Sequence, residues 1–374
     1  MEHEIPYGHQ SINDADIEAV VDVLRGDWLT TGPHVTQFEE TLSAAIAAPC
    51  VAVSSGTAAL HAAYASLDLQ RHDVVLTSPL TFAATASTAL LAGATVELAD
   101  IDPFTLTISP EEVQARMHPA VKVIAAVDFA GTPCKLDRLL DLARDSGAVL
   151  LEDASHSVGG SYREKAIGSV ADITTFSFHP VKTITTCEGG AVSSTRLDLL
   201  ERIKRFRNHG LVHPPEGDGP WHQEVGELGL NYRLSDVHAA LGTSQLRRLT
   251  YFKERRASLV ARYRELLGPV DKARLQESVD DAEPVWHLFI VRVPAELRRG
   301  VYEHLKKRGI GVQVHYVPLH MQQGFSRLGY TRGDFPEAEK AYGEMLSLPL
   351  FPDLTERDQD RVVEELKAAL RLQP

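Results

Sequence analysis

The residue with the greatest chemical potential is Lys182, in the stretch FSFHPVKTITTCEGG at residues 176–190. The flanking sequence predicts that one strand ends near Phe178 and that another apolar run begins at Gly189, so Lys182 lies in the loop between them. Most loop lysines are solvated. In a partly closed site, a lysine can instead lose its proton and form an imine with an aldehyde. Neighbouring residues decide between these two interpretations.

A second candidate is the stretch SSGT at residues 54–57, which follows an apolar run and opens a helical segment. Free N–H groups at a helix start, the hydroxyls of Ser55 and Thr57, and the close approach that Gly56 permits would together form a cradle for phosphate. Ser177, near the lysine, could supply a further hydroxyl. Taken alone, the stretch is explained equally well as an ordinary helix cap.

Two more candidates lie in the stretch LLEDASHS. Asp153 ends an apolar strand, so its carboxylate should be poorly solvated and should need a cationic partner, such as a protonated ring nitrogen. His156, three residues later, could stack on a planar ligand or form a hydrogen bond with it. The alternatives are an aspartate that caps the next segment and a loop histidine with ordinary partners.

Together these positions describe one ligand, because they provide for a phosphate, a planar ring with a basic nitrogen, and an aldehyde that meets an amine. Pyridoxal phosphate (PLP) has all three groups. A ring nitrogen kept protonated by Asp153 makes the ring an electron sink, which lowers the cost of a carbanion next to the imine. The order of phosphate loop, aspartate and lysine along the chain therefore favours a nucleophilic Lys182 over a solvated one.

The framework for these residues is predicted by a regular alternation of apolar runs and helical segments between residues 50 and 160. Such alternation indicates a mostly parallel sheet covered by helices on both faces. In such a sheet, ligands bind beyond the carboxyl ends of the strands, where Asp153 and the SSGT stretch are expected. The predicted strands are CVAVSS, DVVLTSP, TVELADID, VKVIAAVDF and AVLLED, followed by ADITTFSF and GGAVSS.

The C-terminal part has a different pattern, typical of a smaller α+β domain. Its predicted strands are WHLFIVRV and VQVHYVPL, and its predicted helices are ELRRGVYEHLKKRG, PEAEKAYGEML and TERDQDRVVEELKAALR. We therefore predict an α/β protein with a large PLP-binding domain at residues 1–250 and a small domain at 251–374. The hinge is predicted near residues 245–265, within a stretch from Ser235 to about Leu267 that is expected to be a long helix, either continuous or with a break.

The composition and net charge of the chain limit its possible partners and its location. The chain has 374 residues and a net charge of −13, which argues against nucleic acid as a partner because phosphate backbones need a basic face. Three widely spaced cysteines argue against a disulfide framework and a cysteine zinc site, and we predict no metal site. The N-terminal MEHEIPYGHQ lacks the features of a signal peptide, and no apolar run is long enough to span a bilayer. We expect a cytoplasmic protein with no membrane partner.

Longer motifs carry a resemblance to a known family. The chain resembles, almost from end to end, the DegT/DnrJ/EryC1/StrS sugar aminotransferases, which have the fold type I architecture of PLP enzymes. The sequences of its motifs are most similar to those of the branch that makes UDP-4-amino-4,6-dideoxy-N-acetyl-hexosamines on the route to pseudaminic acid. The motifs are DWLTTGPHVTQFE (27–39), SSGTAALHAA (54–63), TSPLTFAATASTALLAGATVELADID (77–102), LLEDASHSVGG (150–160), FSFHPVKTITTCEGGAV (176–192), RFRNHG (205–210), LGLNYRLSDVHAALGTSQLRRL (228–249), WHLFIV (286–291), VHYVPLH (314–320) and LSLPLFPDLTERD (346–358).

The resemblance implies roles for the residues that hold the cofactor. Lys182 matches the lysine that binds the aldehyde and moves a proton, and Asp153 matches the partner of the pyridine nitrogen. Phe82 and His156 match the residues that cover the two faces of the ring. Phosphate contacts are implied for Gly56, Thr57 and Ser177.

The resemblance also implies contacts outside the cofactor. Asn231, in LNYR, matches an asparagine that reaches the cofactor phosphate across a dimer interface, so a homodimer with shared active sites is expected. The region that binds the nucleotide sugar is matched by Thr30, Thr31, His315, Tyr316 and His320.

Two residues depart from the usual family pattern. Cys187 stands where many relatives have glycine or alanine, and we expect inert packing there, with oxidation sensitivity as the alternative. Asp128, in VDFAG, stands where many relatives have histidine. Other members of the hexosamine branch carry aspartate there, so we interpret it as a mark of the subgroup.

The implied reaction is a two-step transamination. L-glutamate would give its amino group to the cofactor, and the C4 keto group of a UDP- or dTDP-linked 4-keto-6-deoxy sugar would then accept it. The diphosphate needs local cations, for which the candidates are Arg202, Lys204, Arg205, Arg207 and Arg233. A solvated basic helix face is the alternative for these residues.

Three other functions compete with this one. A PLP-dependent sugar dehydratase shares the scaffold, but that branch carries histidine in place of the lysine, so Lys182 argues against it. A non-catalytic ligand sensor of this fold would ordinarily carry an added DNA-binding domain, whereas family sequence here begins at Ile5. A keto-cyclitol aminotransferase of aminoglycoside assembly belongs to the same family, and it is the main alternative.

Overall fold

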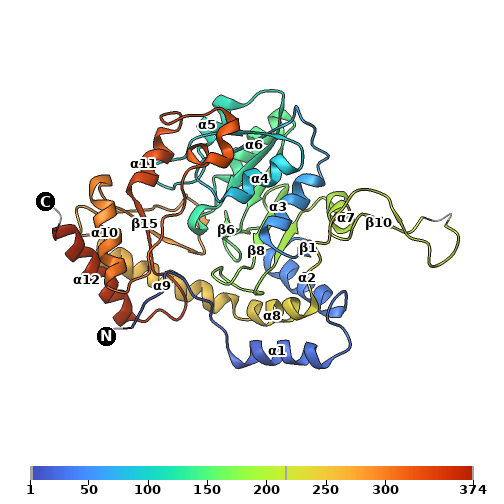
Figure 1. The fold of residues 1–374 in the computed structure, drawn as a ribbon, viewed down its shortest axis with the longest axis horizontal. Coiled ribbons are helices and arrows are strands. Elements are labelled where there is room, and N and C mark those ends of the chain that lie inside the picture. The colour runs from blue at the N-terminus through green and yellow to red at the C-terminus, as the bar shows by residue number, and fades with distance from the viewer. Residues whose placement is uncertain (1–2, 215–216, 373–374) are drawn as a thin grey trace.

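A seven-stranded sheet forms the centre of the larger part of the protein (Figure 1). The computed structural model describes residues 3–214 and 217–372. The strand order is β1-β9-β8-β5-β4-β2-β3, in which neighbours from β8 to β3 are parallel and β9 is antiparallel to both β1 and β8. This confirms the predicted α/β fold. The strands are β1 (Cys50–Val53), β2 (Val74–Thr77), β3 (Thr95–Leu98), β4 (Val121–Val127), β5 (Val149–Asp153), β8 (Ile173–Ser177) and β9 (Gly190–Ser193).

Side chains of the sheet alternate between two buried cores, as the pleat of a strand requires. Val51 and Val53 contribute to one core, and Cys50 and Ala52 contribute to the other. Because both faces are covered by helices, the strands are apolar throughout. The first core is covered by α3 (Gly56–Ala65), α4 (Ala83–Leu91) and α7 (Leu197–Phe206), and the second by α2 (Pro33–Ile46), α5 (Pro110–Arg116), α6 (Leu136–Ser146) and α8 (Asp236–Leu246).

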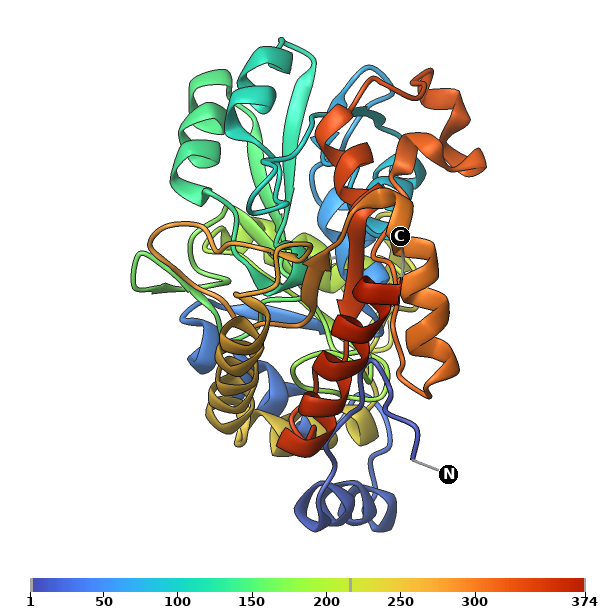
Figure 2. The same cartoon turned by 90° about the vertical axis from the view of Figure 1, so that its left-hand side faces the viewer.

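A third core lies in the C-terminal part, around an antiparallel sheet of order β12-β14-β15. Figure 2 shows α12 and α10 beside each other on this part of the molecule. The predicted long helix is interrupted, because α8 ends at Leu246 and α9 begins at Leu249. The elements are α9 (Leu249–Leu267), β12 (Arg274–Leu275), β14 (Phe289–Arg292), α10 (Ala295–Lys307), α11 (Pro336–Glu344), β15 (Met345–Leu348) and α12 (Glu356–Leu372).

The predicted strand VQVHYVPL (312–319) is wrong. Within this segment Gln313 forms one isolated bridge, to Ser347. Strand β15 pairs with β14 in its place, and all four residues of β15 are buried. The first two of these residues belong to the predicted helix PEAEKAYGEML, which therefore ends earlier than expected. The segment 312–319 instead packs on the first core of the seven-stranded sheet, and its His315 and Tyr316 line a cavity.

The remaining elements lie at the periphery. Helix α1 (Asp14–Arg25) packs along α8, and a hairpin of β10 (Leu211–Val212) and β11 (Glu224–Val225) projects from the body (Figure 1). A small sheet contains β13 (Ala282–Glu283), β6 (Ser161–Tyr162) and β7 (Lys165–Ala166). Among the described residues, we find no helix with the length and apolarity needed to cross a bilayer.

Candidate active site

A cavity of about 480 Å³ opens at the carboxyl ends of the central strands. Strands β4, β5 and β8 run in parallel, and β1 runs in the same direction, so their ends meet at one edge of the sheet. Residues that follow these strands therefore share the cavity. Of the predicted site residues, the structure places here Ser55, Gly56, Thr57, Phe82, Asp153, His156, Ser177, Lys182, His315 and Tyr316.

Lys182 enters the cavity from residues 178–189, which we call the lysine loop, between β8 and β9. The loop is closed by backbone hydrogen bonds from Thr186 to Phe178 and from Phe178 to Gly189, of 3.0 and 2.8 Å. Burial lowers the pKa of the Lys182 ammonium to about 8, although the Asp153 carboxylate acts in the opposite direction. A lysine with this pKa is partly neutral near neutral pH, as a nucleophile must be.

Asp153 is buried at the end of β5, and hydroxyl groups hold both of its carboxylate oxygens. Thr85 Oγ1 donates to Oδ2 at 2.7 Å, and Ser155 Oγ donates to Oδ1 at 2.6 Å. None of the ion pairs found among the described residues includes this carboxylate. A buried carboxylate that is not in an ion pair is suited to a ligand that brings its own positive charge.

The start of α3 lies against the end of β8, with only enough room for glycine. A Cβ atom on Gly56 would lie 2.7 Å from Ser177 Cβ. Close approach of the two backbones places the first N–H groups of the helix, the exposed Thr57 and the Ser177 hydroxyl at the cavity. The side chain of Ser55 accepts a hydrogen bond from Ala58 N at 3.0 Å, so the predicted capping alternative also holds for this residue.

His156 forms one wall of the cavity and packs against a second histidine, His287, with ring centroids 4.3 Å apart. Burial and the neighbouring Lys182 lower the pKa of both imidazoles well below the ordinary value. Burial and then Lys182 also lower the pKa of His315, to about 4. The three rings are therefore neutral at neutral pH, and they add no positive charge beside the lysine.

An aromatic wall faces the histidines. Phe82, at the N-cap of α4, is 59% exposed, which is unusual for phenylalanine, and its ring centroid lies 5.8 Å from that of Tyr316. Tyr316 also contacts the ring of the buried Phe129. An exposed aromatic ring at the cavity is available to cover one face of a planar ligand.

Four predicted site residues lie outside the cavity of this chain. Asn231, Thr30 and Thr31 are all exposed, and Thr31 instead lines a separate hollow beside Arg233. The prediction for His320 needs correction. Its side chain is fully buried and its Nε2 lies 3.0 Å from Glu339 Oε1, so a substrate in the cavity cannot reach it without rearrangement.

The basic residues predicted to hold a diphosphate also lie outside the cavity, where Lys182 is the only lysine or arginine among the described lining residues. Each has a partner elsewhere, as the alternative of a solvated basic face allowed. The pairs are Arg202 with Ser66 O, Lys204 with Glu201, Arg205 with Glu227, Arg207 with Glu39, and Arg233 with Asn208.

The DegT/DnrJ/EryC1/StrS aminotransferase family model matches residues 10–367 of this sequence. The chain belongs to this family. Among its relatives, the UDP-4-amino-4,6-dideoxy-N-acetyl-beta-L-altrosamine transaminase of Campylobacter jejuni is 38% identical, over 98% of this chain and 97% of the relative. The spore coat polysaccharide biosynthesis protein SpsC of Bacillus subtilis is 36% identical, over 98% of this chain and 97% of the relative.

Solved structures agree with the sequence relatives. PseC of Helicobacter pylori, an aminotransferase involved in pseudaminic acid biosynthesis, superposes with a TM-score of 0.93 at 28% identity, over 99% of this chain and 100% of that one. The PLP form of the putative sugar aminotransferase Spr1654 of Streptococcus pneumoniae gives 0.94 at 28% identity, over 99% of both chains. The protein is thus a sugar aminotransferase of fold type I, and its cofactor is PLP.

The cavity fits PLP on its own chemistry. Asp153 is a buried carboxylate that belongs to no ion pair found among the described residues, as a partner for a protonated pyridine nitrogen should be. His156 Nδ1 is buried and has no hydrogen-bond partner among the described residues. The narrow junction of Gly56 with Ser177 presents backbone N–H groups and a hydroxyl to a phosphate. The residues needed for the ring, the aldehyde and the phosphate are thus all present.

Sequence reasoning did not single out Tyr7 and His287, which line the cavity, or Thr85, which holds Asp153 from behind the lining. Thr85 lies in the first turn of α4 and supports Asp153, and His287 is the second residue of the motif WHLFIV, after Trp286. A signal existed for His287, because a histidine in a quoted family motif is a candidate for a site. For Tyr7 there was no local signal.

The two departures from the family pattern have different outcomes. The expected packing of Cys187 is wrong, because this residue is exposed. Its φ of 64° lies in the left-handed region, which explains why glycine suits this position in relatives. Asp128 is fully buried and accepts hydrogen bonds from Ser157 Oγ and Cys134 N, so it is part of the scaffold under His156. Burial raises the pKa of Asp128 and of the neighbouring Glu152.

Proposed function

We propose that this enzyme transfers the amino group of L-glutamate to the C4 keto group of a nucleotide-linked 4-keto-6-deoxy-N-acetyl-hexosamine. The observation that carries the proposal is the meeting of Lys182 and Asp153 in one cavity, since it supplies both a weakly basic amine and a buried carboxylate. The substrate class is supported by the relative of Campylobacter jejuni, whose name specifies a UDP-4-amino-4,6-dideoxy-N-acetyl sugar, the kind of product that amination of such a ketone would give.

Lys182 has the central role in the proposed reaction. Bound PLP supplies an aldehyde for the lysine and a ring that withdraws electrons from the carbon bearing the amine. When glutamate occupies the site, Lys182 Nζ would act as the base that takes the proton from its α-carbon and would hold that proton for return. In the second half-reaction, the same nitrogen moves a proton in the opposite direction, toward C4 of the sugar.

The surrounding residues keep this proton transfer productive. Asp153, fixed by Thr85 and Ser155, would stabilise a positive charge on the ring nitrogen. His156 and Phe82 would cover the ring and exclude water from it. Gly56, Thr57 and Ser177 would hold the phosphate, and Ser55 would contribute through the N–H groups that its cap orients.

The acceptor is assigned to the open side of the cavity, next to His315 and Tyr316. Thr30, Thr31 and Asn231 would reach this site from a second copy of the chain, because they are exposed and lie outside their own cavity. The absence of any arginine from the described cavity lining supports this arrangement, since a phosphate and a diphosphate need more than one lysine.

The acceptor panel is the test of substrate class. The protein is loaded with PLP, treated with glutamate, freed of glutamate, and offered UDP- and dTDP-linked 4-keto-6-deoxy sugars, with and without an N-acetyl group, and a keto-inositol. The visible absorbance of the lysine-bound cofactor should disappear with glutamate and return only with the UDP-linked N-acetyl sugar. Alternation of this kind also predicts ping-pong kinetics.

The main alternative, a keto-cyclitol aminotransferase, predicts recovery with the keto-inositol alone. Recovery with only a dTDP-linked sugar would keep the reaction and change the nucleotide. If glutamate leaves the absorbance unchanged, the donor is wrong, and alanine and glutamine are the next amines to compare.

We also propose that the enzyme is a homodimer in which Asn231 completes the partner's site. Lys182→Ala and Asn231→Ala should each be nearly inactive alone. After dissociation and mixing in equal amounts, roughly one quarter of the wild-type rate should return, because half of the dimers are mixed and each mixed dimer has one intact site. Lys182→Ala mixed with itself provides the blank. An active Asn231→Ala homodimer, or no recovery on mixing, contradicts the shared site.

The division into domains at residues 1–250 and 251–374 remains a proposal. The break between α8 and α9 supports a boundary there. However, Leu319, Phe325 and Phe335 pack into the first core of the large sheet, so the small domain is anchored on the large one. A cytoplasmic location is likewise proposed, and it is consistent with three free cysteines.

A further inference from the structure

Residues 5–13, which we call the N-terminal strap, run from the small domain to the large domain past the mouth of the cavity. At its start, Ile5 N donates to Gly309 O at 2.9 Å, and Leu350 N donates to Tyr7 O at 3.0 Å. The ring of Tyr7 lines the cavity itself. The position of the strap therefore determines where a cavity wall stands.

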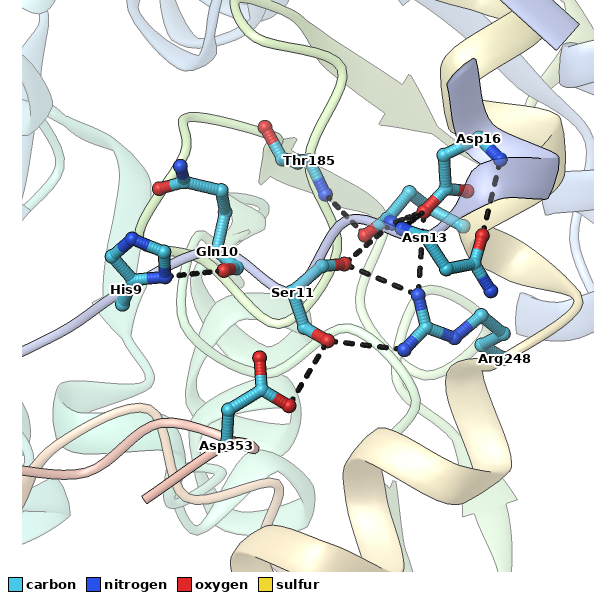
Figure 3. Close-up of polar contacts among 9 residues, drawn as sticks. His9, Gln10, Ser11, Asn13, Asp16, Thr185, Arg248 and Asp353 are labelled. Atoms are coloured by element: carbon cyan, nitrogen blue, oxygen red, sulfur yellow. Dashed lines mark hydrogen bonds and ion pairs between the residues drawn. The ribbon is translucent and has the colours of Figure 1, made fainter. Parts of the chain in front are cut away.

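The strap ends on a buried polar network next to the break between α8 and α9 (Figure 3). Gln245 Nε2 donates to Asp16 Oδ2 at 2.6 Å and to the carbonyl oxygen of Ser11 at 3.0 Å. Arg248 donates to the same two oxygens and to Ser11 Oγ, at 3.3, 3.2 and 3.0 Å. Ser11 Oγ also donates to Asp353 of the small domain at 3.3 Å.

Gln245 extends this network to the lysine loop. It is 1% exposed, and its Oε1 accepts a longer hydrogen bond, of 3.4 Å, from Thr185 N. Thr185 Oγ1 in turn donates to Phe178 O at 3.1 Å and accepts from Cys187 N at 2.9 Å, which joins the two ends of the loop. One amide side chain thus holds the strap with its NH₂ group and the loop of Lys182 with its oxygen.

The chemistry of this position requires an amide. Asp16 is fully buried, and its Oδ2 accepts hydrogen bonds from Gln245, Arg248 and the backbone N–H of Asn13, whereas its Oδ1 has no donor among the described residues. Loss of the Gln245 donor would therefore weaken the support of a buried carboxylate. The loop, by contrast, presents an N–H and needs an acceptor. Glutamine meets both needs with one group and brings no second charge beside Asp16. Glutamate would add repulsion, and leucine would leave Thr185 N without this acceptor and Asp16 Oδ2 with one donor fewer.

We infer that Gln245 is a positioning residue for catalysis, which holds Tyr7 and Lys182 in register across the cavity. It touches neither substrate nor cofactor. The inference rests on the proposed role of Lys182, and it adds that the geometry of the lysine depends on the strap and on the helix break. Loss of this amide should loosen two segments that are far apart in sequence while the sheet stays intact.

The test compares Gln245→Leu with Gln359→Leu, a matched control. Gln359 is equally buried and donates to Leu259 O at 2.6 Å. It belongs to α12 and its side chain contacts α9, away from the lysine loop. In cofactor-free protein, hydrogen exchange of residues 5–12 and 179–187 should rise at least about tenfold in Gln245→Leu relative to the control. In the loaded enzyme, kcat should fall about tenfold with a smaller change in KM, since a displaced lysine slows proton transfer.

A second variant separates the two arms of the network and also serves if Gln245→Leu does not fold. Gln245→Glu keeps the oxygen that accepts from Thr185 N and places a like charge beside Asp16, so exchange should rise in the strap more than in the loop. Equal exchange and equal kcat in Gln245→Leu and Gln359→Leu would overturn the inference. If hydrogen exchange rises in Gln245→Leu but the wild-type enzyme turns over none of the acceptors, the inference about Gln245 is kept and the proposed function is refuted.

Discussion

Replacement of Lys182 by alanine is expected to reduce transamination at least about a thousandfold, because one amine serves both as the nucleophile and as the proton carrier. The variant should also lose the visible absorbance of the lysine-bound cofactor, while its fold is retained. The loop is closed by backbone bonds that do not involve the lysine side chain, so far-ultraviolet circular dichroism and the melting temperature should change little. The measurements are single-turnover rates with glutamate and absorbance spectra.

The control is Lys122→Ala, which removes an exposed lysine that reaches only a backbone carbonyl, on Pro119. Lys122→Ala should keep the wild-type rate and spectrum. Retention of a tenth or more of the rate by Lys182→Ala would remove this lysine from the proposed mechanism.

The lowered pKa of Lys182 has a signature in the cofactor-free protein. Its reaction with an amine reagent, followed by mass spectrometry, should rise with pH around a midpoint near 8 and not near the ordinary 10.5. Between these values the unfolded chain binds the proton that the folded chain lacks, so the free energy of unfolding should rise with pH, by up to about 1.4 kcal/mol per unit. This rise should be absent in Lys182→Ala.

Residues at strand ends were predictable from sequence because the rules that place them are local. Asp153 closes a continuous apolar run, and the carboxyl ends of parallel strands face one edge of the sheet. Gly56 lies just after such a run and at the start of a helix. Once the alternation of strands and helices is recognised, the meeting of these residues with Lys182 follows from topology.

The rest of the cavity depends on contacts between distant segments. Tyr7 reaches the cavity through backbone bonds of its strap to residues more than three hundred positions away, which no local pattern reveals. The alternating stretch that contains His315 resembled a strand, yet its polar rings face the cavity and β15 fills the sheet. The family motif VHYVPLH implies a substrate contact for His320, but the sequence does not show that this ring is buried and paired with Glu339.

Replacement of Asp153 by asparagine is the second change with a large expected effect. The amide has the same shape and keeps one acceptor oxygen, while its NH₂ group can donate to the hydroxyl that faced the lost oxygen, so the fold should persist. What is lost is the negative charge that keeps the ring nitrogen protonated, and with it the stabilisation of the carbanion in the transition state. Preorganised charges of this kind contribute about a hundredfold to a thousandfold in rate, and kcat with glutamate should fall by about that factor.

Asp172→Asn is the matched control. Asp172 lies just before β8 and its carboxylate accepts a hydrogen bond from Leu150 N of β5, so it stands at the opposite end of this strand pair from Asp153. This variant should change stability slightly and leave kcat unaltered. The deciding quantity is the division of the Asp153→Asn effect between rate and cofactor affinity, measured by fluorescence titration with PLP. A charge that acts on the transition state lowers kcat far more than it weakens binding. If affinity alone falls and the saturated enzyme keeps its rate, Asp153 anchors the ring without activating it, and the acid that activates the ring must be sought elsewhere in the cavity.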